Sequence, residues 1–181
     1  MGTVSNVTTA KPNVTGAIFV APVGTTLPTD STTSLATAFK ALGFAGEDGL
    51  TNANTFSSEA FRDWGGLIVC TSETEHEDKF RFKLIEVLNA DVLKEVHGAS
   101  NVTGSLSAGI AVAVNNLPHE EKSWVFETIL RNGVLKRFVV PNAAITEVGE
   151  VVYVGNDLAA YDVTLTATPD EDGNTHYEYI K

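Results

Sequence analysis

The half of the chain that follows Gly66 is a succession of alternating apolar and polar runs separated by turn residues. Residues 79–84 alternate three cationic side chains with three apolar ones, which is the pattern of a strand with one buried face. Asn132 and Gly133 separate two further runs of this kind, and this dipeptide favours a two-residue type I′ hairpin turn because both residues tolerate positive φ. Since no βαβ alternation and no internal repeat interrupt the pattern, we expect a mainly β fold with short helices.

Two short helices are expected among the strands. The stretch at residues 25–43 offers several N-cap hydroxyls, then three apolar side chains at helical spacing, and closes at Gly43. Residues 89–97 form the second predicted helix, with Asn89 as its N-cap. Residues 16–24, an apolar and β-branched run between two glycines, predict a buried strand.

The remaining segments are polar and irregular. Residues 1–15 lack clear periodicity and are expected to form a mobile N-terminal arm. Residues 44–66 are mostly polar and rich in turn residues, which predicts a long loop with room for one strand in residues 50–61. A length of 181 residues fits a single domain.

The charge and the cysteine content argue against several classes of protein. The chain has 12 Lys and Arg against 23 Asp and Glu, with a net charge of -11. Because neutralising phosphates requires clustered cations, tight binding of nucleic acid is not expected. The one cysteine, Cys70, cannot form an internal disulfide and is expected to be a small buried side chain. No apolar run reaches the ~18 residues of a membrane span, so no membrane segment is expected.

The stretch SETEHEDKFRF at residues 72–82 is the most unusual polar cluster. On a strand, three of its glutamates would share one face: Glu73, Glu75 and Glu77. His76 would lie on the other face, separated from them by the backbone, while Phe80 and Phe82 would turn into the core. We expect a solvated acidic end of one strand that runs into the next strand. A contact with a divalent cation is the alternative, which would need ligands from elsewhere in the chain.

Other polar clusters match no catalytic, cofactor or metal motif. No Gly-x-Ser-x-Gly elbow is present, and the segment at residues 43–49 is acidic where a phosphate loop needs a lysine. Residues 170–174 resemble a calcium loop in composition only and are expected to form a turn. Trp64 and Trp124 are expected to be packing residues rather than a platform for sugars. We therefore expect no enzyme activity, no cofactor and no bound metal.

Several segments resemble a known family in their order and spacing. They include DWGG at residues 63–66, FRFKLIEVLNADVLKEVHG at residues 80–98 and, as the most specific part, the ending at residues 146–180. From about residue 17 onward the chain resembles the major tail (tail tube) protein of long-tailed, siphovirus-type bacteriophages. None of these segments is a catalytic signature, so the specificity lies in their combined length and order.

The resemblance implies a β-sandwich or half-barrel subunit with a flanking α-helix, here residues 89–97. In the family, subunits close into hexameric rings whose inner strands form one continuous β-barrel around a lumen, and the rings stack into a tube. Residues 44–66 would then be a loop that contacts the next ring. Glu73, Glu75 and Glu77 are candidates for the lumen wall, where repeated carboxylates would repel DNA; on the outside they would only keep the particle soluble.

The resemblance also implies partners and a location. The partners would be further copies of the chain together with the tape measure, tail terminator and distal tail proteins, with DNA only as passing cargo and no membrane. The protein would be made in the cytoplasm of the bacterial host and reside in the virion tail. The alternative, from another class, is a capsid decoration protein or an adhesive β-sandwich that binds a surface ligand, neither of which would polymerise alone.

Overall fold

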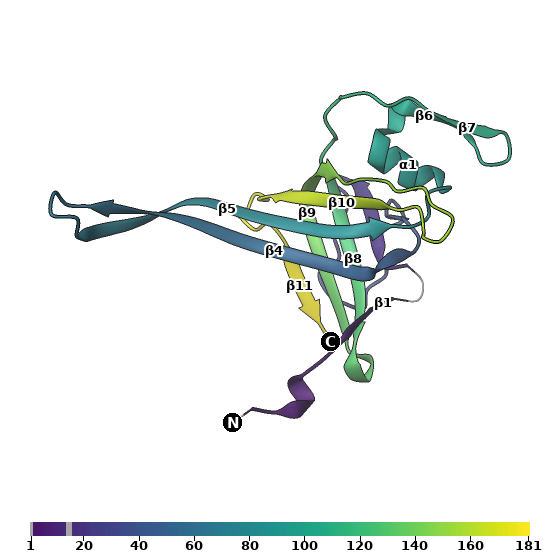
Figure 1. Cartoon of the computed structure of the whole chain (residues 1–181). Helices are drawn as coiled ribbons and strands as arrows, with labels where there is room; N and C mark the ends of the chain where they lie inside the picture. Colours follow the sequence, from purple (N-terminus) through teal and green to yellow (C-terminus); the bar gives the residue numbers. More distant parts are fainter. Residues whose placement is uncertain (1, 14–15) are drawn as a thin grey trace.

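The computed structural model of the chain describes residues 2–13 and 16–181, and its main element is one antiparallel sheet (Figure 1). The strands follow the order β3-β2-β8-β9-β10-β5-β4, with β1 paired to β8 and β11 paired to β9, and a separate small sheet joins β6 to β7. The strands have the following bounds: β1 Ala10–Pro12, β2 Ile18–Pro22, β3 Lys40–Ala41, β4 Ala45–Arg62, β5 Ile68–Leu84, β6 Val102–Ser105, β7 Gly109–Val112, β8 Lys122–Leu130, β9 Leu135–Val148, β10 Tyr161–Thr168 and β11 Tyr177–Ile180. The predicted mainly β fold is confirmed.

The main sheet bends so that its two halves pack on one another around a single core. β5 and β8 are not neighbours in the sheet, yet the rings of Phe80 and Phe82 lie 5.5 and 5.3 Å from the ring of Phe126. Phe82 also lies 5.9 Å from Trp124. In Figure 1, β8 and β9 run steeply behind β10, β5 and β4. These contacts across the core make the subunit a β-sandwich, as the resemblance implied.

The alternation predicted in residues 79–84 is present on β5. Phe80, Phe82 and Leu84 are at most 2% exposed, and their partners on β10 are apolar and buried as well. The run at residues 16–24 likewise contains a strand, β2, whose Ile18 and Val20 are buried. The alternation of residues 79–84 thus identified one buried strand face, and the continuous apolar run between two glycines identified the other strand.

The predicted helix at residues 89–97 is confirmed as α1, Ala90–His97. The Asn89 side chain accepts a hydrogen bond from the Asp91 N–H at 3.0 Å, which satisfies one of the unpaired donors of the first turn. The apolar side chains of the helix pack into the core: Val92, Leu93 and Val96. α1 thus flanks one end of the sandwich (Figure 1).

The helix predicted within residues 25–43 is wrong. The Asp30 carboxylate accepts hydrogen bonds from the backbone N–H groups of Thr32 and Thr33, both at 2.6 Å, and so stabilises a turn instead. Residues 40–41 are extended as β3, and the Leu42 N–H donates to the Ile18 carbonyl at 2.9 Å. Pairing with β2 places Leu42 in the core without a helix, and the many threonines of this stretch have low helix propensity.

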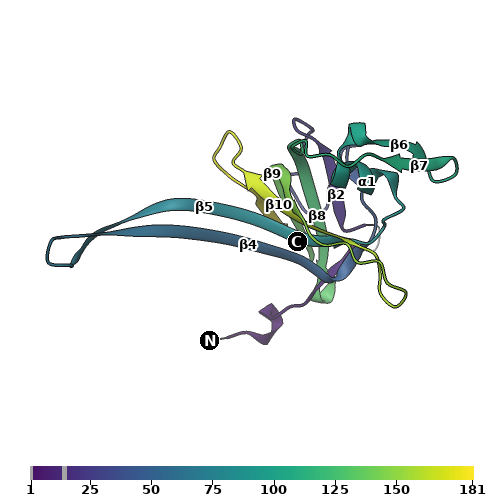
Figure 2. The ribbon, with the colours of Figure 1, turned by 45° about the horizontal axis from the view of Figure 1, so that its top comes forward.

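The long loop predicted at residues 44–66 is also wrong, because most of it is the 18-residue strand β4. The strand allowed for in residues 50–61 is confirmed within it. β4 pairs along its length with β5, which is one continuous strand rather than the two that the sequence suggested. Figure 2 shows the two strands leaving the sandwich as a long hairpin.

The N-terminal arm is partly attached to the body. Residues 10–12 form β1, which pairs with β8 through Lys11 and Ile129 among others. The segment before β1 contains a short 3-10 turn, Val4–Asn6, and extends away from the sandwich (Figure 1). Residues 1, 14 and 15 of the predicted arm lie outside the described residues.

The turn between β8 and β9 has the predicted backbone but one more residue. Asn132 and Gly133 adopt positive φ angles of 64° and 80°. However, the Leu130 N–H donates to the Val134 carbonyl at 2.7 Å, so Arg131 belongs to the turn as well. The connection is a three-residue loop rather than a two-residue type I′ turn.

We expect Gly133→Val to lower the free energy of unfolding by more than about 1 kcal/mol, because a β-branched residue is strained at positive φ. A Cβ at this position would meet no atom within 4 Å, so the loss would come from the backbone conformation alone. Chemical denaturation gives the measurement. Gly155→Val is the matched control, since Gly155 also has open space but no positive φ. Equal stability of the two variants would refute the backbone argument.

Candidate assembly surfaces

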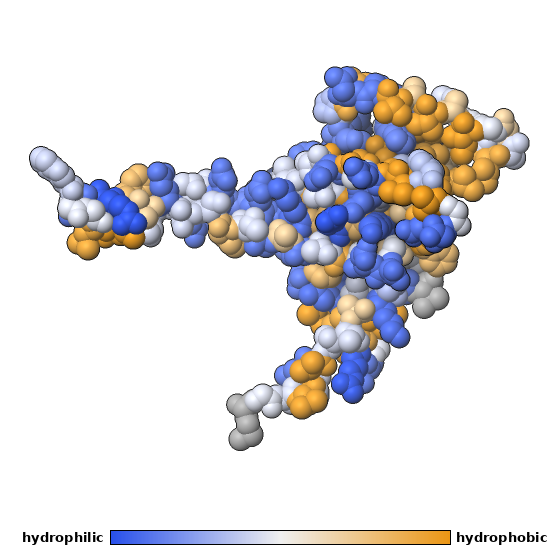
Figure 3. Space-filling model, viewed as in Figure 1, coloured by the Kyte–Doolittle hydropathy of each residue, from blue (hydrophilic) through white to orange (hydrophobic). Residues whose placement is uncertain are grey.

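The longest run of exposed residues in the described structure is the outer section of the β4–β5 hairpin, residues 51–77, which we call the ribbon. Every residue of the ribbon is exposed. It nevertheless carries large apolar side chains, with the following exposed fractions: Phe56 63%, Phe61 49%, Trp64 105%, Leu67 69%, Ile68 48% and Val69 61%. Figure 3 shows apolar side chains near its outer end. A two-stranded hairpin is at best marginally stable in water, so the ribbon is suited to packing against a partner.

Two sequence predictions fail on the ribbon. Cys70 is exposed rather than buried. Trp64 lies at the turn of the ribbon, fully exposed, and does not pack in the core. Trp124 is 1% exposed and is a packing residue, as predicted. The sequence could not separate the two tryptophans, because burial depends on whether a second layer covers the strand.

The three glutamates do not share one face. Ser57 pairs with Glu75 and the next residue, Ser58, pairs with Glu73, so a β-bulge inserts Thr74 between them. Because paired residues point to the same side and successive residues alternate, the bulge turns Glu73 to the face opposite Glu75. Glu77 stays with Glu75, and its carboxylate lies 2.8 Å from the Lys79 ammonium.

His76 packs on its own hairpin. Its ring stacks on Phe56 with centroids 4.4 Å apart, and its Nε2 lies 2.7 Å from Asn54 Oδ1. Within residues 2–13 and 16–181, no three His, Cys, Asp or Glu side chains form a group that could hold a metal ion. The polar stretch is thus organised by cross-strand contacts.

A buried carboxylate fixes the ribbon at its root. Asp78 is 1% exposed and accepts hydrogen bonds from Asn52 Nδ2 at 2.7 Å and Thr175 Oγ1 at 2.6 Å. His176 Nδ1 lies 2.5 Å from the same carboxylate, and the His176 ring meets Phe80 edge to face at 5.2 Å. The cluster ties both strands of the hairpin to the C-terminal segment. Sequence reasoning missed it, since its members lie up to 98 residues apart.

An apolar groove opens beside the start of β4, with a volume of about 630 Å³. The N-terminal arm and the ends of β8 and β9 form its sides. We call this hollow the core groove, and its apolar lining includes Leu50, Phe82, Phe126, Leu130, Phe138 and Ile180. The core groove therefore lies at an open end of the sandwich, beside the core.

The outer face of β5 and β10 carries three cations, and each one is paired with a carboxylate. Arg81 donates from Nε and Nη2 to both oxygens of Asp162, at 2.9 and 2.6 Å. These hydrogen bonds lower the pKa of the Asp162 carboxyl. Lys83 pairs with Asp48 in the same way that Lys79 pairs with Glu77. We call this surface the ion-pair face. Lys83 and Asp48 are 35 residues apart in the sequence, and Arg81 and Asp162 are 81 residues apart, so a pattern of neighbouring residues could not predict these two pairs.

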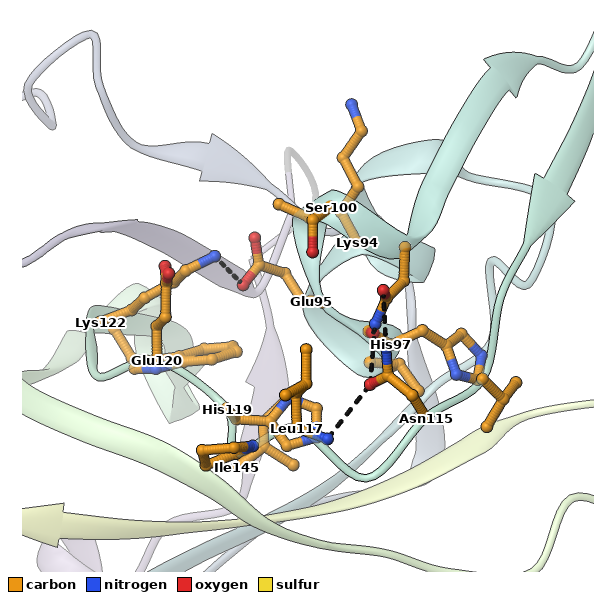
Figure 4. Close-up of a pocket in the computed structure, with 17 residues that line it drawn as sticks. Lys94, Glu95, His97, Ser100, Asn115, Leu117, His119, Glu120, Lys122 and Ile145 are labelled. Atoms are coloured by element: carbon orange, nitrogen blue, oxygen red, sulfur yellow. Dashed lines mark hydrogen bonds and ion pairs between the residues drawn. The ribbon is translucent and has the colours of Figure 1, made fainter.

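A second, more polar hollow of about 320 Å³ lies between α1 and the segment before β8 (Figure 4). Glu95 and Lys122 form an ion pair at 2.6 Å across it. His97 and His119 both line it; burial lowers the pKa of His97, and the charge of His119 adds to the effect. Neither a nucleophile with its base nor a metal ligand set is assembled in this hollow, and its ion pair connects the helix to the sheet.

Comparison with known proteins identifies the family. A family model described as phage tail tube protein matches residues 5–181. The chain belongs to the phage tail tube proteins. No curated protein matches the chain at a significant level. The family is structural and builds a tube in the virion tail, and the sandwich with its flanking helix is the subunit of this tail tube protein. None of the helices in the described part of the chain is long and apolar enough to cross a membrane.

Proposed function

We propose that this tail tube protein closes into hexameric rings that stack head to tail into the tube of a siphovirus-type tail, through which DNA passes into the host. The family membership and the resemblance in the sequence support the ring and the conduit. The observation that carries the stacking proposal is the ribbon, a 27-residue hairpin whose every residue is exposed in the isolated subunit. An element of this size needs a partner that covers it.

We propose that the partner is a second copy of the chain. The ribbon projects from one side of the subunit (Figure 1), so a contact between it and another surface of the next copy is heterologous. A heterologous contact repeated along an axis generates an open tube rather than a closed dimer. The segment at residues 44–66 thus keeps its proposed role between rings, as a strand instead of a loop.

The remaining parts of the proposal concern the cargo and the other tail components. A net charge of -11 suits a conduit that does not retain DNA. The tape measure, tail terminator and distal tail proteins would bind the tube inside and at its two ends. The protein is made in the host cytoplasm and acts without enzyme activity. The alternative, a capsid decoration or adhesive module, would expose the ribbon in the assembled particle as well.

The single cysteine provides the test, because Cys70 lies on the exposed ribbon, close to its turn. Electron microscopy of the concentrated purified protein should show tubes. In free subunits a maleimide should modify Cys70 rapidly, and in tubes the rate should fall at least tenfold. The control is Cys70→Ser with Ser107→Cys, in the exposed β6–β7 turn on the side of the subunit opposite the ribbon (Figure 1). Failure to polymerise, combined with binding to preformed capsids, would favour the decoration protein instead.

A further inference from the structure

The tube requires each subunit to present one sheet face to the channel, and two of the faces are already covered. The inner face of the sandwich is packed with the core side chains. The outer face of β2, β8 and β9 lies under residues 23–39, because Arg137 Nη1 donates to the carbonyls of Asp30 and Thr33 at 2.7 and 2.8 Å. Val125 and Val139 on that face are at most 1% exposed. The outer face of β5 and β10, the ion-pair face, stays open.

The composition of the ion-pair face suits a wall that DNA slides past. The positions of β10 on this side are Asp162, Thr164, Thr166 and Thr168. The adjoining part of β9 adds Thr146, whose hydroxyl lies 2.8 Å from that of Thr166. No large apolar side chain interrupts this surface within the described residues, so a neighbouring protein would find little to bury there.

We propose that the ion-pair face lines the channel and that its carboxylates keep the three β5 cations from binding DNA phosphates. The proposal rests on the proposed tube. Three free cations at alternate positions of one strand, repeated around each ring, would bind DNA through counterion release. Instead, the cations face four carboxylates, namely the three partners and Glu147, which lies near Arg81.

The Arg81–Asp162 pair is the strongest of these contacts. It uses two parallel N–H···O bonds, a geometry that also suits phosphate, so Asp162 occupies the donors that a phosphate would need. Asp162 is only 16% exposed and its lowered pKa keeps it ionised at neutral pH. A passing phosphate would therefore have to displace the Asp162 carboxylate from Arg81. Glu75 and Glu77 extend this surface along the ribbon, whereas Glu73 faces away from it.

Neutralising two of the carboxylates tests the pairing. The double variant Asp162→Asn, Asp48→Asn keeps the side-chain sizes and frees Arg81 and Lys83. Free subunits should then bind a fluorescent DNA duplex at least tenfold more tightly at low salt than the unmodified protein does. The slope of log K against log salt should steepen by up to about 1.8, or about 0.9 for each freed cation. Fluorescence anisotropy gives both quantities.

The matched control is Glu171→Gln, Asp172→Asn, which changes the net charge equally in the exposed turn between β10 and β11, whose two carboxylates form no ion pair with a described cation. An affinity within twofold of the unmodified protein is expected for it. Equal gains in the two double variants would overturn the pairing, since general charge would then explain the effect.

The position of the face is tested separately in assembled tubes. On a Cys70→Ser background, Thr164→Cys should react with a small maleimide and not with one coupled to a large polymer, whereas Ser107→Cys, in the exposed β6–β7 turn, should react with both. Reaction of Thr164→Cys with the bulky reagent in intact tubes would overturn the channel assignment and leave the proposed tube standing. Absence of tubes by electron microscopy would instead refute the proposed function.

Discussion

Replacing residues 55–77 by Asn-Gly will yield a folded subunit that no longer assembles into tubes. Asn54 and Asp78 are paired in the hairpin, so a two-residue turn can join them without changing the register. The deleted residues are all exposed and contribute no side chain to the core. The melting temperature should therefore change by only a few degrees, while assembly should be lost because the partner surface has gone. Sedimentation and electron microscopy give the two readouts.

Two point variants test the role of the ribbon in assembly without removing it. Ile68→Ser removes an exposed apolar side chain from the ribbon, and Leu106→Ser removes another exposed one from the β6–β7 turn. The ribbon variant should raise the concentration needed for assembly at least tenfold, and the control should leave it unchanged. Tubes of normal length from the shortened chain would show that the ribbon is dispensable.

Asp78→Ala will lower the free energy of unfolding by about 3 kcal/mol or more, as expected when one partner of a buried charged cluster is removed. The carboxylate accepts from Asn52 and Thr175 and pairs with His176, and the substitution removes this acceptor from all three, leaving Asn52 with only the Lys79 carbonyl at 3.3 Å. The C-terminal segment would also lose its hydrogen bonds to Asp78 on β5. Denaturant unfolding measures the loss.

Two further variants separate the loss of the buried cluster from the loss of any single carboxylate. Asp78→Asn keeps the shape and one acceptor, so it should lose less than Asp78→Ala does. Asp172→Ala, an exposed carboxylate in the 170–174 turn, should change stability by less than about 0.5 kcal/mol. If Asp78→Ala were as stable as Asp172→Ala, the cluster would not fix the root of the ribbon.

Hydrogen bonds within a few residues made parts of the fold predictable. The cap at Asn89 and the positive φ angles at Asn132 and Gly133 are local, and the structure contains them. The turn at residues 170–174 is another case, since the Gly173 N–H donates to the Asp170 carbonyl at 3.0 Å. The helix predicted within residues 25–43 from cap residues, apolar spacing and a closing glycine is absent, because the cross-strand pairing at residues 40–41 was not visible locally.

The candidate surfaces were predictable only in outline. The sequence identified residues 72–82 as a polar strand and the family as that of tail tube proteins. It did not reveal the bulge at Thr74, which moves Glu73 to the other face. A bulge depends on the register with β4, which a pattern within one strand does not contain.

The sequence by itself determined the class of fold, the flanking helix and the family, because period, caps and turns are properties of neighbouring residues. Only the tertiary structure decided that residues 44–66 are a strand of the ribbon, that Asp78 is buried, and that the β5 cations are each paired. Most of these contacts join residues far apart along the chain: Lys83 and Asp48 are 35 residues apart, Arg81 and Asp162 are 81 apart, and Asp78 and His176 are 98 apart. Such contacts exist only once the sheet has closed on its core, since loop closure has an entropic cost that burial and pairing across the sheet must offset.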